Sequence, residues 1–193
     1  MRFTVTVQDS AGVSRVAAIE AIRGYQVNYV VPDSAAPGIA TVTISFGSGS
    51  SASGSAQVDA IGPGLYAISG TGQGVATAGA ALYKSVGSIQ VESVFHCATG
   101  SCTAEPLSLG NPGDRLVLLL YGTGLRNNSG VQNASATIGG YRATVLYAGA
   151  QPQYPGFDQV NLVLPPSLAG AGEVPIVLTV DRQTTNVVTV SVQ

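Results

Sequence analysis

The stretch QVNYVVP at residues 26–32 returns as QVNLVLP at residues 159–165, identical at five of seven positions. Both copies alternate polar and apolar residues and end at a proline, which has no amide to donate to a strand ladder. Each copy is followed by small residues, then by Gly38 or Gly172, and then by another alternating strand. This recurrence indicates an internal duplication and predicts two homologous β modules.

Alternating runs of strand length, separated by glycine and proline, continue through the rest of the chain. Residues 13–22 fit either a helical stripe or a strand, and Gly24 favours the strand. We therefore predict an all-β protein of two immunoglobulin-like β-sandwich modules joined by a Gly/Pro-rich connector. The other expected strands are residues 3–7, 39–46, 114–121, 134–138, 141–147, 174–180 and 186–192.

The two modules differ in completeness. A strand beginning at Asp114 precedes Gln159 by 45 residues, and its counterpart in the first copy would fall before Met1. We expect residues 1–61 to be an incomplete sandwich and 112–193 a complete sandwich. Residues 62–111 are expected to be a connector with a disulfide loop and two hairpin strands, near residues 75–83 and 88–95. The missing strands leave unpaired amides and carbonyls, which the connector, an upstream domain or another subunit must satisfy.

Charge is sparse. Asp, Glu, Lys and Arg make up 9% of the residues, against about 25% in typical domains. Long amphipathic helices need charged outer faces, which this chain lacks. The net charge is −2 and the eight basic residues are scattered, so we expect no nucleic-acid partner. No run approaches the roughly 20 apolar residues of a membrane-spanning helix, so we expect no membrane span.

The chain has two cysteines, in the stretch HCATGSC at residues 96–102. Four small or polar residues between Cys97 and Cys102 can fold into a tight turn, and we favour a local disulfide. Such a bond implies an oxidising compartment, so we expect the protein to be extracellular or at the cell surface, its export signal removed or upstream. A metal site using His96 with both thiolates, or a pair of reduced thiols, are the alternatives; a closed zinc site needs four ligands.

An ordered set of short motifs spans the chain: Gln26–Asn28 with Val30 and Pro32, and residues 63–66, 72–76, 112–114, 121–125, 138–140, 147–149 and 156–161. This set resembles the C-terminal domain found in large secreted proteins of Solibacter-type acidobacteria. The resemblance implies exported β-sandwiches without an established activity, and the cysteine loop departs from it. Residues 112–193 also resemble the IPT/TIG class of immunoglobulin-like domains through the strand at residues 113–124.

No residue pattern points to catalysis or to a cofactor. A serine hydrolase would need His96, the one histidine, and a Gly-x-Ser-x-Gly elbow is absent. The aspartates lie mostly at turns and strand ends, where we expect them to accept hydrogen bonds from local amides. The repeated glutamine and asparagine side chains have two interpretations: contact with a polar ligand, or hydrogen bonds that close a loop onto the sheet. Together with the repeated prolines, these residues are Gln26, Asn28, Pro32, Gln159, Asn161 and Pro165.

These features favour a non-catalytic extracellular structural or adhesive protein. It is either the terminal module of a longer secreted protein or a surface-fibre subunit that accepts a neighbour's strand. We accordingly expect self-association, or contact with neighbouring domains, through exposed β edges. The alternative is a carbohydrate-binding or adhesion module that would stack a glycan on Tyr25, Tyr29, Tyr141, Tyr147, Tyr154 and Phe157.

Overall fold

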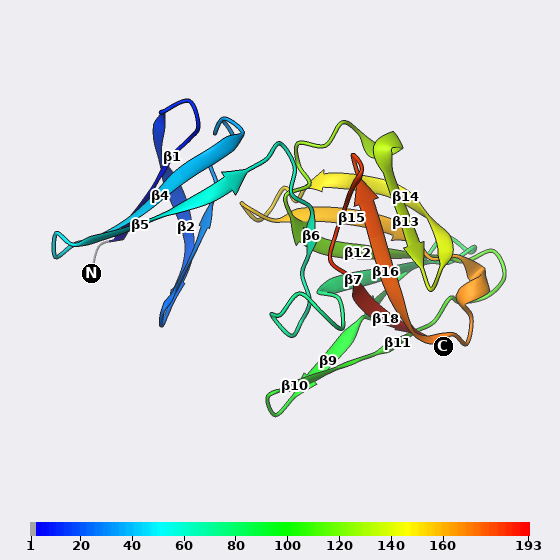
Figure 1. Ribbon diagram of the computed structural model, residues 1–193. Coiled ribbons are helices and arrows are strands. Elements are labelled where there is room, and N and C mark those ends of the chain that lie inside the picture. Colours follow the sequence, from blue (N-terminus) through cyan, green and yellow to red (C-terminus); the bar gives the residue numbers. More distant parts are fainter. Residues whose placement is uncertain (1–2) are drawn as a thin grey trace. The chain divides into compact units, whose positions relative to one another are not determined.

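A computed structural model describes residues 3–193 and is almost entirely β-structure (Figure 1). Two single-turn 3₁₀ helices, η1 (Val131–Asn133) and η2 (Pro166–Leu168), accompany the strands. The all-β prediction is therefore confirmed. The strands are β1 (Phe3–Gln8), β2 (Ser14–Arg23), β3 (Gln26–Val30), β4 (Gly38–Phe46), β5 (Ser51–Val58), β6 (Gly64–Leu65), β7 (Ala78–Tyr83), β8 (Ile89–Ser93), β9 (Phe95–Ala98), β10 (Ser101–Ala104), β11 (Pro106–Leu107), β12 (Arg115–Thr123), β13 (Ala134–Ile138), β14 (Tyr141–Ala150), β15 (Asp158–Val163), β16 (Gly172–Val180), β17 (Gln183–Thr184) and β18 (Val188–Val192).

The chain divides into two compact units. The smaller unit contains residues up to Ala60 and the segment Gln153–Gly156. Its five strands form one sheet in the order β3-β2-β1-β4-β5. Val5, Val7, Ala17 and Ala40 are its buried apolar residues, a small core for five strands.

The larger unit contains residues 61–152 and 157–193. Its main sheet has the order β11-β18-β16-β13-β14-β15-β12-β7-β8, with β17 beside β16 and β6 beside β12. The first part of β14 pairs with β13 and the rest pairs with β15, so one long strand joins the two halves of the sheet. The inward residues of both halves form a single large core, which includes Leu118, Leu162 and Leu178.

Residues 62–111 are not a separate connector, and this part of the predicted division is wrong. β6, β7, β8 and β11 all lie in the sheet of the larger unit, where β7 pairs with β12 and β11 pairs with β18. Hairpin strands were expected near residues 75–83 and 88–95, close to the observed β7 and β8. The Gly- and Ala-rich sequence of β7 gives a weak strand signal, and pairing with the apolar β12 stabilises it.

Within residues 3–193, no helix has the length and apolarity required to cross a membrane.

Candidate functional site

The smaller unit repeats five strands of the larger one, with matching register. Strands β3-β2-β1-β4-β5 correspond to β15-β14-β13-β16-β18. Val5 pairs with Ala17 and Ile44, just as Ala136 pairs with Ala143 and Leu178. The pairings of β4 with β5 and of β16 with β18 also match. The structure thus extends the duplicated sequence motif into a duplicated half of a fold.

Even the irregularities of the sheet are shared. β2 has a bulge between Ile19 and Ala21 where it pairs with β3, and β14 has one between Val145 and Tyr147 where it pairs with β15. In both copies the bulge lies opposite the same two repeat positions, which are Asn28 and Tyr29 in the smaller unit. A bulge bends its strand and increases the local twist. The shared bulges therefore give the two hairpins the same course, so the repeated strand takes the same place in each.

The repeated strand has one neighbour in the smaller unit and two in the larger unit. β15 lies between β14 and β12, whereas in the described part of the chain β3 pairs with β2 alone. An edge strand presents backbone N–H and C=O groups that can bind another strand. The open side of β3, where β12 would lie in the larger unit, is the candidate functional site.

The inner face beside this edge retains apolar side chains that a second layer would cover. Val27 and Tyr29 are half-buried, while the equivalent Val160 and Leu162 are completely buried against β12. Val42 and Ile44 are also half-buried, and their counterparts Ile176 and Leu178 have no exposed surface. Partly exposed apolar area of this kind is stabilised when a further strand covers it.

The opposite edge of the smaller sheet has small residues at two of its three inward positions, and Val58 is the large residue that remains there. Gly54 and Ala56 of β5 occupy the positions of Val188 and Val190, which are buried in β18. Small side chains leave little apolar surface for a partner to cover. Among the described strands of the smaller unit, β3 is the edge strand that keeps the larger apolar surface, through Val27 and Tyr29.

The repeated glutamines and asparagines form matching side-chain pairs. Gln26 Nε2 donates a hydrogen bond of 2.7 Å to Asn28 Oδ1, and Gln159 Nε2 donates one of 2.8 Å to Asn161 Oδ1. The amides in each pair bond to each other along one strand, so the expected closing of a loop onto the sheet does not occur. They mark the outward face of the repeated strand in both copies.

The repeated prolines begin equivalent turns. Ala35 N donates to the Pro32 carbonyl at 2.9 Å, and Leu168 N donates to the Pro165 carbonyl at 3.1 Å. The following glycines, Gly38 and Gly172, both have positive φ. In both units these backbone hydrogen bonds form a turn directly after the repeated strand.

Asp9 fixes the loop that leaves β3. Its buried carboxylate accepts the backbone N–H groups of Ala11, Val13 and Ala36 at 3.0–3.1 Å, and Arg15 Nη1 lies 2.5 Å away. The Ala36 N–H is the largest of the effects that lower the pKa of Asp9 to about 2; burial opposes it, while Val13 and Arg15 add to it. The charged carboxylate therefore joins the β1–β2 turn to the segment after β3.

A carboxylate that fastens β12 in the larger unit has no counterpart beside β3. Asp158 is fully buried and accepts the backbone N–H groups of Leu125 at 2.6 Å and Arg126 at 3.2 Å, just beyond β12. Arg126 Nε also donates to it at 2.9 Å. The equivalent position before Gln26 is Tyr25, whose side chain is fully exposed. A strand bound at β3 would thus be held by the ladder and the apolar face, without this clamp.

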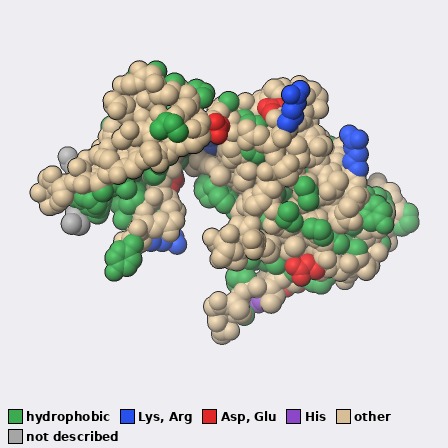
Figure 2. Space-filling model, viewed as in Figure 1, with side chains coloured by type: hydrophobic (Ala, Val, Ile, Leu, Met, Phe, Trp, Pro, Cys, Tyr) green, Lys and Arg blue, Asp and Glu red, His purple; other side chains and the backbone are tan. Residues whose placement is uncertain are grey.

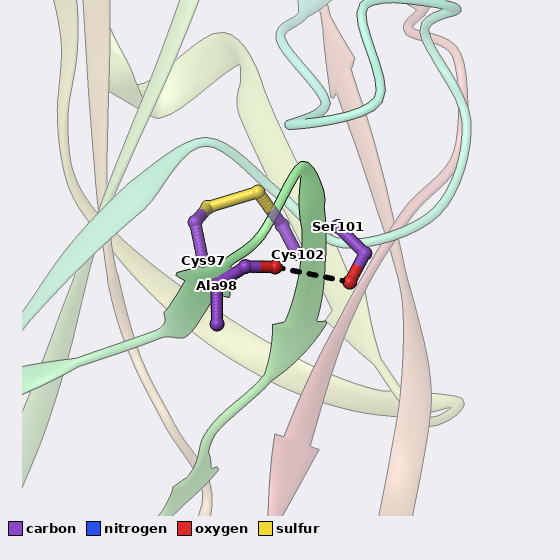
Figure 3. Close-up of a disulfide and its surroundings, with 4 residues drawn as sticks. All are labelled: Cys97, Ala98, Ser101 and Cys102. Atoms are coloured by element: carbon purple, nitrogen blue, oxygen red, sulfur yellow. Dashed lines mark hydrogen bonds between the residues drawn. A yellow bond between two sulfur atoms is a disulfide. The ribbon is translucent and has the colours of Figure 1, made fainter.

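The disulfide prediction is confirmed. Cys97 and Cys102 are directly opposite each other in the β9–β10 hairpin and are bonded (Figure 3). Thr99 and Gly100 at the turn both have positive φ, as the tight hairpin turn requires, and Ser101 Oγ donates to the Ala98 carbonyl at 3.3 Å. With both sulfurs in the bond, the alternative thiolate site with His96 does not exist in this state.

The aromatic residues proposed for glycan stacking lie in different surroundings. Tyr141 and Tyr147 are exposed on one strand, β14, Tyr25 is exposed beside β3, and Phe157 packs edge-on against Tyr66 with ring centroids 5.2 Å apart. Asp114 accepts the N–H groups of Ser85 and Asn111, as expected for a turn carboxylate. Across residues 3–193, no group of three or more His, Cys, Asp or Glu side chains could hold a metal ion.

Comparisons with protein-family models, curated proteins and solved structures found no match for this chain. The open edge of β3 is therefore interpreted from its own geometry. The repeated sequence motif identified this strand, and the comparison of β3 with β15 identified its unpaired side.

Proposed function

We propose that this chain is a non-catalytic, exported structural protein that joins its neighbours by β-strand complementation. The larger unit is a complete immunoglobulin-like sandwich, and the smaller unit is the matching half, with β3 as the acceptor edge. The observation that carries the proposal is a contrast: β12 pairs with β15, whereas within residues 3–193 no strand pairs with β3 on the corresponding side. Adding a strand there would satisfy the backbone and cover Val27 and Tyr29.

Composition and redox chemistry support export and assembly. The face in Figure 2 shows only isolated charged groups, in keeping with the 9% content of charged residues. A surface with so few charges suits a subunit that buries much of its area against others. The exposed Cys97–Cys102 bond suits an oxidising compartment, and the resemblance to secreted Solibacter-type domains agrees with both.

The proposal is tested by measuring self-association of the full chain. Analytical ultracentrifugation at increasing concentration should show growing oligomers, and negative-stain electron microscopy should show filaments. Uniform monomers at high concentration would overturn the proposal.

A matched pair of variants locates the contact. Val27→Lys places a charge on the inner face at the β3 edge and should abolish association, because natural edge strands use inward charges to prevent pairing. Ser55→Lys adds the same charge to the exposed β5 edge and should associate like the parent protein. Tyr29→Lys is a second acceptor variant, and circular dichroism of each variant confirms that the sheets have formed. Equal association by all variants would show that β3 is not the contact.

A further inference from the structure

The pairing of β12 with β15 in the larger unit indicates which kind of strand would fit beside β3. On β15, β12 runs antiparallel with Leu118 opposite Leu162 and Leu120 opposite Val160, and both leucines are completely buried. The strand for β3 must therefore be antiparallel, with aliphatic side chains opposite Tyr29 and Val27. The residue between them lies opposite Asn28, on the outward face.

β8 alternates aliphatic and polar residues in the required way, and it is itself an edge strand. Within the described residues β8 pairs with β7 alone and lies at the end of the larger sheet. Ile89 and Val91 are 60% and 82% exposed, unusually open for two aliphatic side chains of one short strand. Gln90 lies between them, and its Nε2 donates to Glu92 Oε1 at 3.4 Å, so polar side chains line the other face.

The backbone of β8 has the orientation needed for such a pairing. Lys84 N donates to the Ser88 carbonyl at 2.8 Å, which makes these residues a hydrogen-bonded pair of the β7–β8 hairpin. Bonded and non-bonded pairs alternate along antiparallel strands. Ile89 and Val91 therefore direct their N–H and C=O groups away from β7, towards the open edge.

The backbone groups of β3 are oriented in a corresponding way. Leu164 N donates to the Leu116 carbonyl at 3.0 Å, so Leu162 and Val160, which follow in steps of two, also direct their backbone groups to β12. Their equivalents are Tyr29 and Val27. The bonding positions of β3 thus carry its inward apolar residues, and those of β8 carry its exposed aliphatic residues.

We infer that β8 of one copy of this chain binds β3 of a second copy as the complementing strand. Val91 lies opposite Val27, Ile89 opposite Tyr29, and Gln90 opposite Asn28. The inference rests on the proposed function and names the partner segment. Because donor and acceptor are different surfaces of the same chain, the contact is heterologous and repeats from copy to copy.

Engineered cysteines test the register. Asn28 and Gln90 would form a non-hydrogen-bonded pair, with Cα atoms about 4.5 Å apart, a separation that a disulfide can span. Asn28→Cys and Gln90→Cys proteins, purified separately and mixed under mild oxidation, should give a reducible covalent dimer. Mass spectrometry should find the two new cysteines joined. The mixture of Gln26→Cys with Gln90→Cys, displaced by two residues, should give little dimer.

A second set of variants separates failure of this inference from failure of the proposed function. Val91→Lys should weaken self-association at least about tenfold, because the interface would bury an unpaired charge. Val86→Lys, at the exposed β7–β8 turn, is the control and should associate normally. If Val27→Lys abolishes association while Val91→Lys leaves it unchanged, and the mixed cysteine variants form no covalent dimer, β8 is not the donor but β3 remains the acceptor. If neither lysine has an effect, both proposals are wrong.

Discussion

The two units contain the same five strands in the same order and register, yet their interiors differ. In the larger unit the repeated inward positions are buried except Val145, which is half-buried; in the smaller unit most are half-buried. Pairing within a sheet is stabilised by backbone hydrogen bonds and cross-strand contacts, so it persists without a facing layer. Complete burial requires further apolar side chains to cover this face, and within residues 3–193 the larger unit supplies them from strands such as β7 and β12. The two units thus show that strand pairing can be complete where the burial of apolar side chains is not.

The smaller unit has adapted unevenly to the missing layer. β5 carries Gly54 and Ala56 where β18 carries valines, whereas β3 retains Val27 and Tyr29. A surface that is always exposed to water gains nothing from large apolar groups, while one that is covered in an assembly does. This difference within one sheet is the physical basis for proposing β3 as the contact.

A matched pair of valines should show the largest difference between the units. Val160→Ala removes two methyl groups from a fully buried site and should cost about 2–3 kcal/mol of unfolding free energy in the larger unit. Val27→Ala, at the equivalent half-buried site, should cost less than about 1 kcal/mol in the smaller unit. Residue-resolved amide hydrogen exchange at low protein concentration measures each unit separately. Equal costs in dilute protein would mean that β3 is already covered.

Acid should destabilise the smaller unit through Asp9. The pKa of Asp9 is lowered from 3.8 to about 2 in the folded state, so the ionised carboxylate stabilises the fold above its unfolded pKa. This contribution is lost as the pH falls through the folded value, within the window from about 4 to about 2. Asp9→Asn should be less stable at neutral pH and should lose less stability over that window.

The pKa of Asp114 in the larger unit is also lowered, chiefly by the Ser85 N–H, so acid affects both units. Amide exchange in β1 and β2 reports on the smaller unit and therefore measures the contribution of Asp9. An Asp9→Asn protein with the same acid profile as the parent would assign the loss to other groups.

The smallest effect on either core should come from removing the disulfide. Chain entropy assigns about 2 kcal/mol to closing a loop this short, but β9 and β10 form a two-stranded sheet of their own. The double variant Cys97→Ser with Cys102→Ser should lose amide protection only near residues 95–104. Limited proteolysis should then cleave the hairpin faster than in the parent, while β12 and β15 stay protected. Loss of protection in β12 would instead show that the hairpin supports the core.

Much of the fold was predictable because its signals are local. Period-two alternation indicated β1, β3 and β4, a continuous apolar run at residues 116–120 indicated β12, and the spacing of Cys97 and Cys102 indicated the disulfide. The role of residues 62–111 was not predictable: β7 is rich in alanine and glycine, and its position depends on β12, more than 30 residues later. The bulges opposite Asn28 and Asn161 also left no distinct sequence signal, since a bulge is defined by the partner strand.

The amino-acid sequence by itself determined the duplication, the strand-forming stretches and the faces that their side chains share, because these depend on neighbours in the chain. The sequence predicted that the first copy would be incomplete, but only the tertiary structure decided that β3 is the strand left at an edge. QVNYV ends a sheet in one unit, and QVNLV lies inside a sheet in the other, next to β12. Sheet neighbours are joined by hydrogen bonds between distant residues, so the same local pattern can be either covered or left open to a partner.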